Sequence, residues 1–137
     1  MSNMAKKEKQ LLMVDLCARL PYHPTIQIYN DCWEGCRVGE FDNTMGFHHV
    51  EAFLCDRIEI LPYLRPMSSM TEEERKEFDT KFHICTKLIE HYFAYAKPII
   101  EIYQESIDWL NSHHFDYRGL IPMGLALEAP KDMYKFD

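Results

Sequence analysis

The most conspicuous chemistry-bearing string in the sequence is the six-residue run at positions 113–118, which holds two histidines, an acid, a tyrosine and an arginine. Neutral imidazole nitrogens are common metal ligands, and the planar guanidinium of arginine matches a phosphate or a carboxylate. The run could therefore bind a metal or an anionic ligand, and its candidate site residues are His113, His114, Asp116, Tyr117 and Arg118.

A structural role explains the same run. At the end of a helix, His113 and His114 would place positive charge beside the negative end of the helix dipole, and Asp116 would cap the next turn. Adjacent helical residues point about 100° apart, so the two histidines cannot easily share one metal ion. We favour the structural role and keep ligand binding as the alternative.

A second histidine cluster is formed by His48, His49 and Glu51. On a strand, His49 and Glu51 would share a face while His48 would point away. The spacing matches no metal-ligand signature, so we predict exposed histidines and a salt-bridging acid. A zinc site is the alternative, and its further ligands would be the cysteines of neighbouring strands, Cys32, Cys36 and Cys55.

Aromatic and cationic residues mix near the expected sheet, with Trp33 and Arg37 as the central candidates. Such a surface can stack a base and hold a phosphate, although core aromatics explain the pattern as well. The sequence contains no GxGxxG, Walker, GxSxG or HExxH motif. We therefore predict no catalytic residue and no cofactor, and we lean towards a protein that is not an enzyme.

Composition indicates a single folded domain over residues 1–137, with loose tails at 1–6 and 130–137. Hydrophobic residues make up 47% and charged residues 27% of the chain. The net charge of -7 disfavours nucleic acid as a partner. We find no signal peptide and no long apolar run, so we predict a cytoplasmic protein with no membrane partner. The five cysteines are irregularly spaced, and we expect them to be reduced thiols.

The elements that would position these residues begin with a helix over Lys7–Leu20, which Pro21 ends. Its apolar residues recur every four positions, so one face should enter the core. The residues expected on or beside that face are Leu12, Met13, Leu16, Cys17 and Leu20. Cys17 is accordingly expected to be buried.

An antiparallel meander of short strands is predicted next. Thr25–Tyr29 alternates in polarity, and a Gly-punctuated segment from Cys32 to Phe41 gives a second strand. Phe47–Leu54 is a third strand or a helix, and Arg57–Leu61 is a short fourth strand. Regular structure should then stop at two prolines, Pro62 and Pro66.

The second half of the chain is predicted to be mainly helical. A capping box at Thr71–Glu74 starts an amphipathic pattern that continues to Ala96, either as one helix of about 25 residues or as two helices with a bend. Pro98 then opens a helix that reaches Ser112. A turn and a strand at Leu125–Glu128 follow. The expected fold is therefore α+β, with an N-terminal helix and two to three C-terminal helices packed on one face of a small antiparallel sheet.

Three blocks of the chain resemble small uncharacterised proteins encoded by gut Bacteroidales and by their phages and prophages. The blocks are LMVDLCARLPY at 12–22, ILPYLRPMSSMTEEE at 60–74 and WLNSHHFDYRGLIPMGLALEAPKDMY at 109–134. The resemblance implies no particular activity. It implies an accessory protein of a phage or mobile element that works inside a bacterial cell.

Three functions fit these observations. The preferred one is a non-enzymatic binding protein that acts on a host protein or sequesters a small nucleotide-like ligand, in a pocket that a homo-oligomer could complete. The first alternative is a metal-binding module or metal-dependent hydrolase that uses His, Cys and Asp residues. The second alternative is a virion assembly component.

Overall fold

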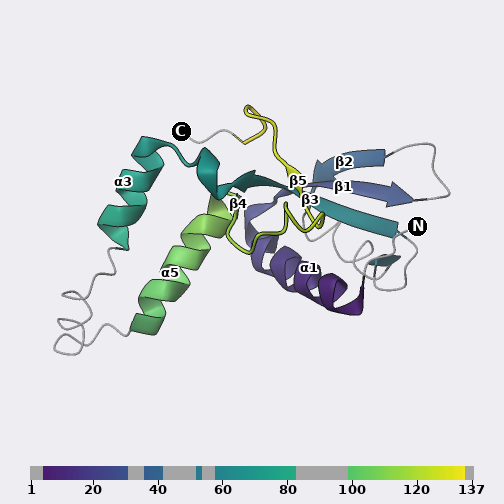
Figure 1. Ribbon diagram of the computed structural model, residues 1–137, viewed down its shortest axis with the longest axis horizontal. Coiled ribbons are helices and arrows are strands. Elements are labelled where there is room, and N and C mark those ends of the chain that lie inside the picture. Colours follow the sequence, from purple (N-terminus) through teal and green to yellow (C-terminus); the bar gives the residue numbers. More distant parts are fainter. Residues whose placement is uncertain (1–4, 31–35, 42–51, 54–57, 83–98, 135–137) are drawn as a thin grey trace.

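The computed structural model describes residues 5–30, 36–41, 52–53, 58–82 and 99–134. The described chain is α+β, as predicted, with helix α1 at the N-terminus, a small mixed sheet, and helices α3 and α5 in the second half (Figure 1). No helix within these ranges is both long and apolar enough to span a membrane.

Within the described residues, five strands form the sheet. Its centre is β1 (Thr25–Asn30), which pairs antiparallel with β2 (Cys36–Glu40) on one side and β3 (Ile58–Pro66) on the other. Two short strands, β4 (Phe115–Asp116) and β5 (Leu127–Glu128), pair parallel with the second half of β3. The antiparallel part was predicted, whereas the parallel additions come from segments far away in sequence.

The prediction that Pro62 and Pro66 break regular structure is wrong, because β3 runs through Pro62 and ends at Pro66. Pro62 pairs with Ile26 in the last register position between β1 and β3, and pairing with β5 starts at Tyr63. The missing N–H of Pro62 therefore falls where β3 exchanges one partner strand for another. A proline costs little at the end of a hydrogen-bonded ladder.

Helix α1 (Lys6–Arg19) is confirmed, but the prediction that Cys17 is buried is wrong, because its side chain is exposed. The buried face of α1 includes Asp15 and Arg19, both 0% exposed, beside its leucines. This face packs on the sheet in the main core, which contains Leu12, Leu16, Ile26, Ile28, Phe41, Phe53, Ile58, Ile60, Leu64, Leu120, Leu125 and Ala126.

A second, smaller core lies between the two later helices, α3 (Glu72–Lys81) and α5 (Ile99–Ser112), which lie side by side in Figure 1. Trp109 of α5 is 7% exposed, and its ring centroid is 5.3 Å from that of Phe78 on α3. Helix α3 ends at Lys81 with a non-helical Phe82, so the prediction of one 25-residue helix is wrong. The alternative of two helices concerns residues 83–98, which lie outside the described residues.

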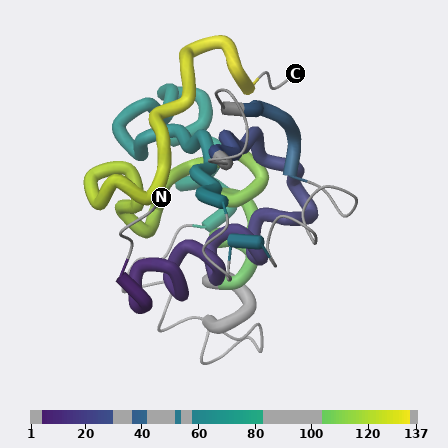
Figure 2. The backbone as a smooth tube through the Cα atoms, turned by 90° about the vertical axis from the view of Figure 1, so that its right-hand side faces the viewer, coloured from purple at the N-terminus to yellow at the C-terminus, as the bar shows by residue number. Residues whose placement is uncertain are grey.

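Two further expectations are corrected by the described residues. Ala52 and Phe53 are helical, so of the two alternatives for Phe47–Leu54 the helix is confirmed and the strand is wrong at these positions; the remainder of that range lies outside the described residues. The expected loose tail is wrong for Tyr134, which is anchored to the sheet: its hydroxyl donates to the Tyr63 carbonyl (2.7 Å) and accepts from the Thr25 amide (2.8 Å). The segment leading to Tyr134 runs along the outside of the molecule (yellow, Figure 2).

Candidate functional site

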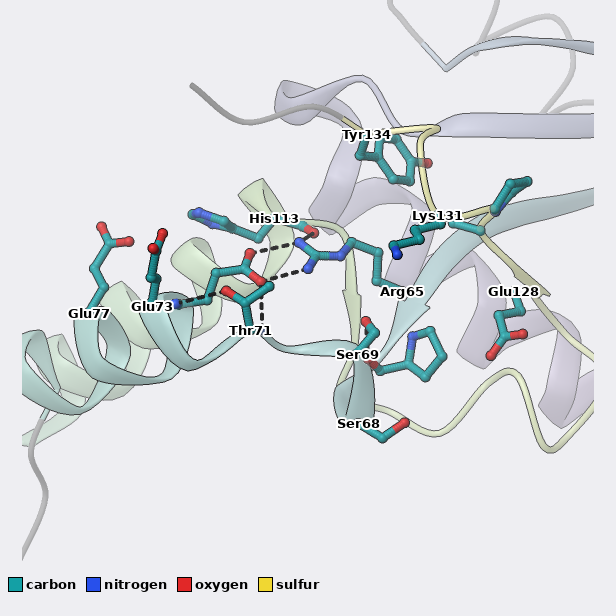
Figure 3. Close-up of a pocket in the computed structure, with 14 residues that line it drawn as sticks. Arg65, Ser68, Ser69, Thr71, Glu73, Glu77, His113, Glu128, Lys131 and Tyr134 are labelled. Atoms are coloured by element: carbon teal, nitrogen blue, oxygen red, sulfur yellow. Dashed lines mark hydrogen bonds and ion pairs between the residues drawn. The ribbon is translucent and has the colours of Figure 1, made fainter.

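A cavity of about 840 Å³ lies between the start of α3, the turn η2 (Met67–Ser69) that precedes it, and the C-terminal segment (Figure 3). This volume is within the range of small-ligand sites in proteins. We call residues 127–134 the C-terminal strap. The cavity is lined by Arg65, Pro66, Ser68, Ser69, Thr71, Glu73, Glu74, Glu77, His113, Glu128, Ala129, Pro130, Lys131 and Tyr134.

The first wall of the cavity is fixed by an ion pair between Arg65 at the end of β3 and Glu74 in α3. Both terminal nitrogens of Arg65 donate to the Glu74 carboxylate, at 2.7 and 2.8 Å. Glu74 also accepts from the Thr71 amide (3.0 Å), and the Thr71 hydroxyl accepts from the Glu74 amide (3.1 Å). This confirms the predicted capping box. Burial raises the pKa of Glu74, but the bonds from Arg65 and Thr71 outweigh it and leave that pKa below its ordinary value.

The second wall is the C-terminal strap. Its strand β5 pairs with β3, and the Ala129 amide donates to the Leu64 carbonyl at 2.8 Å. Five residues further on, Tyr134 is fixed by its hydroxyl bonds and by its ring, which stacks on His114 with a centroid distance of 3.8 Å. The strap is therefore held at both ends.

His113 lines the cavity from the end of α5 (Figure 3). Its ring stacks on Trp109 at 3.9 Å, and its Nδ1 lies 2.9 Å from the Trp109 carbonyl oxygen. A carbonyl can only accept, so this bond forms in the tautomer that carries the proton on Nδ1. Glu77 lies on the same side of the cavity, and its hydrogen bond from Lys81 (2.8 Å) lowers the pKa of its carboxyl.

His114 faces a different environment from His113. It is 6% exposed, adopts a left-handed backbone conformation (φ 63°) and stacks on Tyr134. Burial, the largest cause, and the nearby charges of Arg19, His113 and Arg65 together lower the pKa of His114 to about 4. The two histidines therefore do not act as one site: His113 borders the cavity, and His114 holds the strap.

Asp116 has the structural role that the sequence favoured. Its carboxylate oxygens accept from the amides of Leu120 (2.8 Å) and Ile121 (2.9 Å), so it caps the turn that follows β4. Asp116 is 6% exposed, and these bonds compensate for the burial of its charge.

Tyr117 and Arg118 belong to a partly buried polar network rather than to the cavity. Arg118 Nε donates to one Asp15 oxygen (3.0 Å), and Arg19 Nε donates to the other (2.7 Å). The Tyr117 hydroxyl donates to Asn111 (2.9 Å) and accepts from Arg118 (3.2 Å). The interpretation of this string as one ligand site is thus replaced by three separate environments.

Sequence reasoning missed Asp15 and Arg19. The available signal was their spacing: an acid and an arginine four residues apart share a helix face, and here that face also carries Leu12 and Leu16. It also missed the strap residues of the cavity, because Glu128 and Lys131 become neighbours of α3 only through the pairing of β5 with β3.

The other candidate residues lie mostly outside the part of the chain that the structure describes. Arg37 is exposed on β2, and Trp33, His48, His49 and Glu51 lie outside the described residues. Across the ranges that the structure describes, no group of three or more His, Cys, Asp or Glu side chains is placed to hold a metal ion. The arrangement that remains is a cavity with two anchored walls and a lining that mixes polar and apolar surface, suited to reversible binding. Comparison with known proteins found no matching family model, no matching curated protein and no matching solved structure.

Proposed function

We propose that this chain is a non-enzymatic binding protein and that the cavity between α3 and the C-terminal strap is its ligand site. The observation that carries the proposal is a cavity of about 840 Å³ whose two walls are each fixed by buried or bidentate contacts. Walls that are fixed before binding lose little conformational entropy when a ligand enters.

The biological setting, a phage or mobile-element protein inside a bacterial host cell, is proposed from the sequence resemblance alone. A cytoplasmic location and a homo-oligomer are carried over as proposals from composition and from the small size of the domain. Of the two expected occupants, a nucleotide-like ligand is the less suited to this cavity. Arg65 is the one arginine that lines the cavity, and both of its terminal nitrogens already donate to Glu74. No structural observation favours a metal-dependent hydrolase or a virion component, so both stay predictions from the sequence.

Native mass spectrometry of the full chain, purified from bacterial lysate at low salt and compared with its denatured mass, tests the proposal. Ser68 is exposed and lines the cavity, so Ser68→Trp should obstruct the cavity without removing a buried contact. Thr80→Trp, on an exposed position of α3 that does not line the cavity, is the matched control. We expect a bound small molecule or peptide in the wild type and Thr80→Trp, and its loss in Ser68→Trp. A ligand retained equally by all three proteins would contradict the proposal.

A further inference from the structure

We propose that the C-terminal strap is an acid-sensitive latch, in which protonation of His114 releases Tyr134 and, with it, one wall of the cavity. This inference rests on the proposed function, because it concerns how binding at that cavity is regulated. Its test needs no ligand, so the latch and the binding function can fail separately.

The two walls of the cavity are not held equally firmly. The α3 wall is fixed by the bidentate pair of Arg65 and Glu74 and by the packing of α3 in the second core. Among the strap residues that the structure describes, Tyr134 alone makes a side-chain hydrogen bond to the sheet, and residues 130–132 before it are exposed. A segment with few buried contacts opens at a lower free energy than the rest of a fold, so the strap is the wall that can move.

Tyr134 holds the strap at the point where β3 leaves β1. The register of these two strands ends at the pair Ile26 and Pro62, and its next position would bring Thr25 opposite Tyr63. The Tyr134 hydroxyl accepts from the Thr25 amide (2.8 Å) and donates to the Tyr63 carbonyl (2.7 Å), so it takes the place of a direct bond between the strands. The far end of the strap therefore depends on one side chain.

The same side chain covers His114. The two rings are stacked, with centroids 3.8 Å apart and planes inclined by 16°. His114 is 6% exposed, so the Tyr134 ring shields one of its faces from water. When the strap opens, that face of the imidazole meets solvent, and the environment of His114 changes with the position of the strap.

Positive charge surrounds His114 while the strap is closed. The charged and titratable groups near it come from four segments: Arg19 of α1, His113 at the end of α5, Arg65 of β3 and Tyr134 of the strap. Asp15 pairs with Arg19 and Glu74 pairs with Arg65, which offsets part of this charge. A tyrosine ring attracts a cation above its face. Burial, the largest cause, and the three cationic groups outweigh that attraction and lower the pKa of His114 to about 4.

Acid therefore favours the open strap. With the strap closed, His114 stays neutral down to about pH 4, whereas an open strap exposes its ring and lets its pKa return towards 6.5. Between these pH values the open state binds more protons, so each pH unit lost raises the ratio of open to closed strap by up to about tenfold. The latch is fully closed above about pH 6.5 and weakens as the pH falls towards 4.

Hydrogen exchange of the full chain tests the latch when it is measured by NMR as protection factors, which remove the intrinsic pH dependence of exchange. The strap is reported by the Ala129 amide, which donates to the Leu64 carbonyl, and the α3 wall by the Arg75 amide, which donates to the Thr71 carbonyl. From about pH 7 to about pH 4.5, protection at Ala129 should fall by about 50-fold, whereas protection at Arg75 should change by less than about threefold.

Two variants separate the charge of His114 from the hold of Tyr134. His114→Asn tolerates the positive φ and gains no proton in this range, so protection at Ala129 should vary with pH by less than about threefold. The matched control is His23→Asn, because His23 is an exposed histidine that also has a positive φ (48°), and it should behave as the wild type. Tyr134→Phe keeps a ring for the stack but removes the hydroxyl, so Ala129 should lose about tenfold in protection already at about pH 7.

The inference would be overturned by a wild type whose Ala129 protection does not depend on pH, or by a dependence that persists in His114→Asn. An equal fall at Ala129 and Arg75 would show a general loss of stability and would overturn it as well. If His114→Asn does not fold, Tyr134→Phe decides: unchanged protection at Ala129 overturns the latch, and reduced protection supports it. A lysate that yields no bound molecule would refute the proposed function and leave the latch in place, and the reverse result is equally distinguishable.

Discussion

The buried Asp15 carboxylate offers a demanding test of how this fold is held together. Asp15 and Arg19 are both 0% exposed, and Asp15 accepts from Arg19 (2.7 Å) and from Arg118 (3.0 Å). Asp15→Asn keeps the shape of the side chain but removes its negative charge. The two guanidinium groups then face a neutral amide that can accept from one of them, while Arg19 stays fully buried.

The expected cost follows from this geometry. Removal of one partner of a buried ion pair typically costs about 3–5 kcal/mol, because the other charge is left uncompensated. Asparagine retains one acceptor, so we expect the lower end, about 3 kcal/mol. This is a large share of a total stability of about 5–15 kcal/mol. With an m-value of about 1.5 kcal/mol/M in urea, the unfolding midpoint should fall by about 2 M.

Urea unfolding monitored by circular dichroism measures this change, with Asp79→Asn on the exposed surface of α3 as the matched control. The control should stay within about 0.5 kcal/mol of the wild type. A second variant, Asp15→Leu with Arg19→Met, replaces the pair by apolar side chains and should be more stable than Asp15→Asn. The reasoning would be refuted by a loss below about 1 kcal/mol in Asp15→Asn, or by a double variant no more stable than the single one.

Three further perturbations test other parts of the structure. Trp109→Ala should cost about 3–5 kcal/mol in urea unfolding, because Trp109 is 7% exposed in the second core; a loss below about 1 kcal/mol would show that it does not anchor that core. Tyr134→Phe removes the hydroxyl that joins Thr25 to Tyr63 and should cost about 1–3 kcal/mol, with faster hydrogen exchange at the Thr25 amide; unchanged exchange there would contradict the anchoring role. His114 has a folded pKa of about 4 against 6.5 in the unfolded chain, so between these pH values only the unfolded chain gains the proton. The free energy of unfolding should therefore fall by about 3 kcal/mol as the pH drops from about 7 to about 4. His114→Asn, which tolerates the positive φ, should lose this part of the pH dependence of the free energy of unfolding. An identical pH dependence in the wild type and the variant would contradict the assignment.

Local signals in the sequence predicted the elements whose stability is local. The capping box at Thr71 and Glu74 placed the start of α3, and the alternation of Ile26 and Ile28 placed β1. The same reasoning failed for Cys17, because it assumed that the buried face of α1 would be wholly apolar. That face instead carries the buried ion pair of Asp15 and Arg19. The further partners of this pair lie about 100 residues later in the chain: Arg118 donates to Asp15, and the Phe115 carbonyl accepts from Arg19.

The cavity could not be predicted because its walls meet through long-range pairing. Proline statistics argued against a strand through Pro62, yet the second half of β3 is the part that pairs with β4 and β5. Without that pairing, Glu128 and Lys131 read as a polar tail. Of the histidine string, only His113 lines the cavity, and the other members stabilise the surrounding fold.

Arg65 connects the stability of the fold to the chemistry of the cavity. Its amide donates to the His114 carbonyl (2.8 Å), which joins β3 to β4, and its guanidinium lies 4.2 Å from the centroid of the Phe115 ring in the second core. The same guanidinium holds Glu74 in the α3 wall. The α3 wall is therefore positioned by both the sheet and the second core, and a ligand does not have to order it on binding. Because both terminal nitrogens of Arg65 are held on Glu74, this guanidinium is a structural group of the α3 wall.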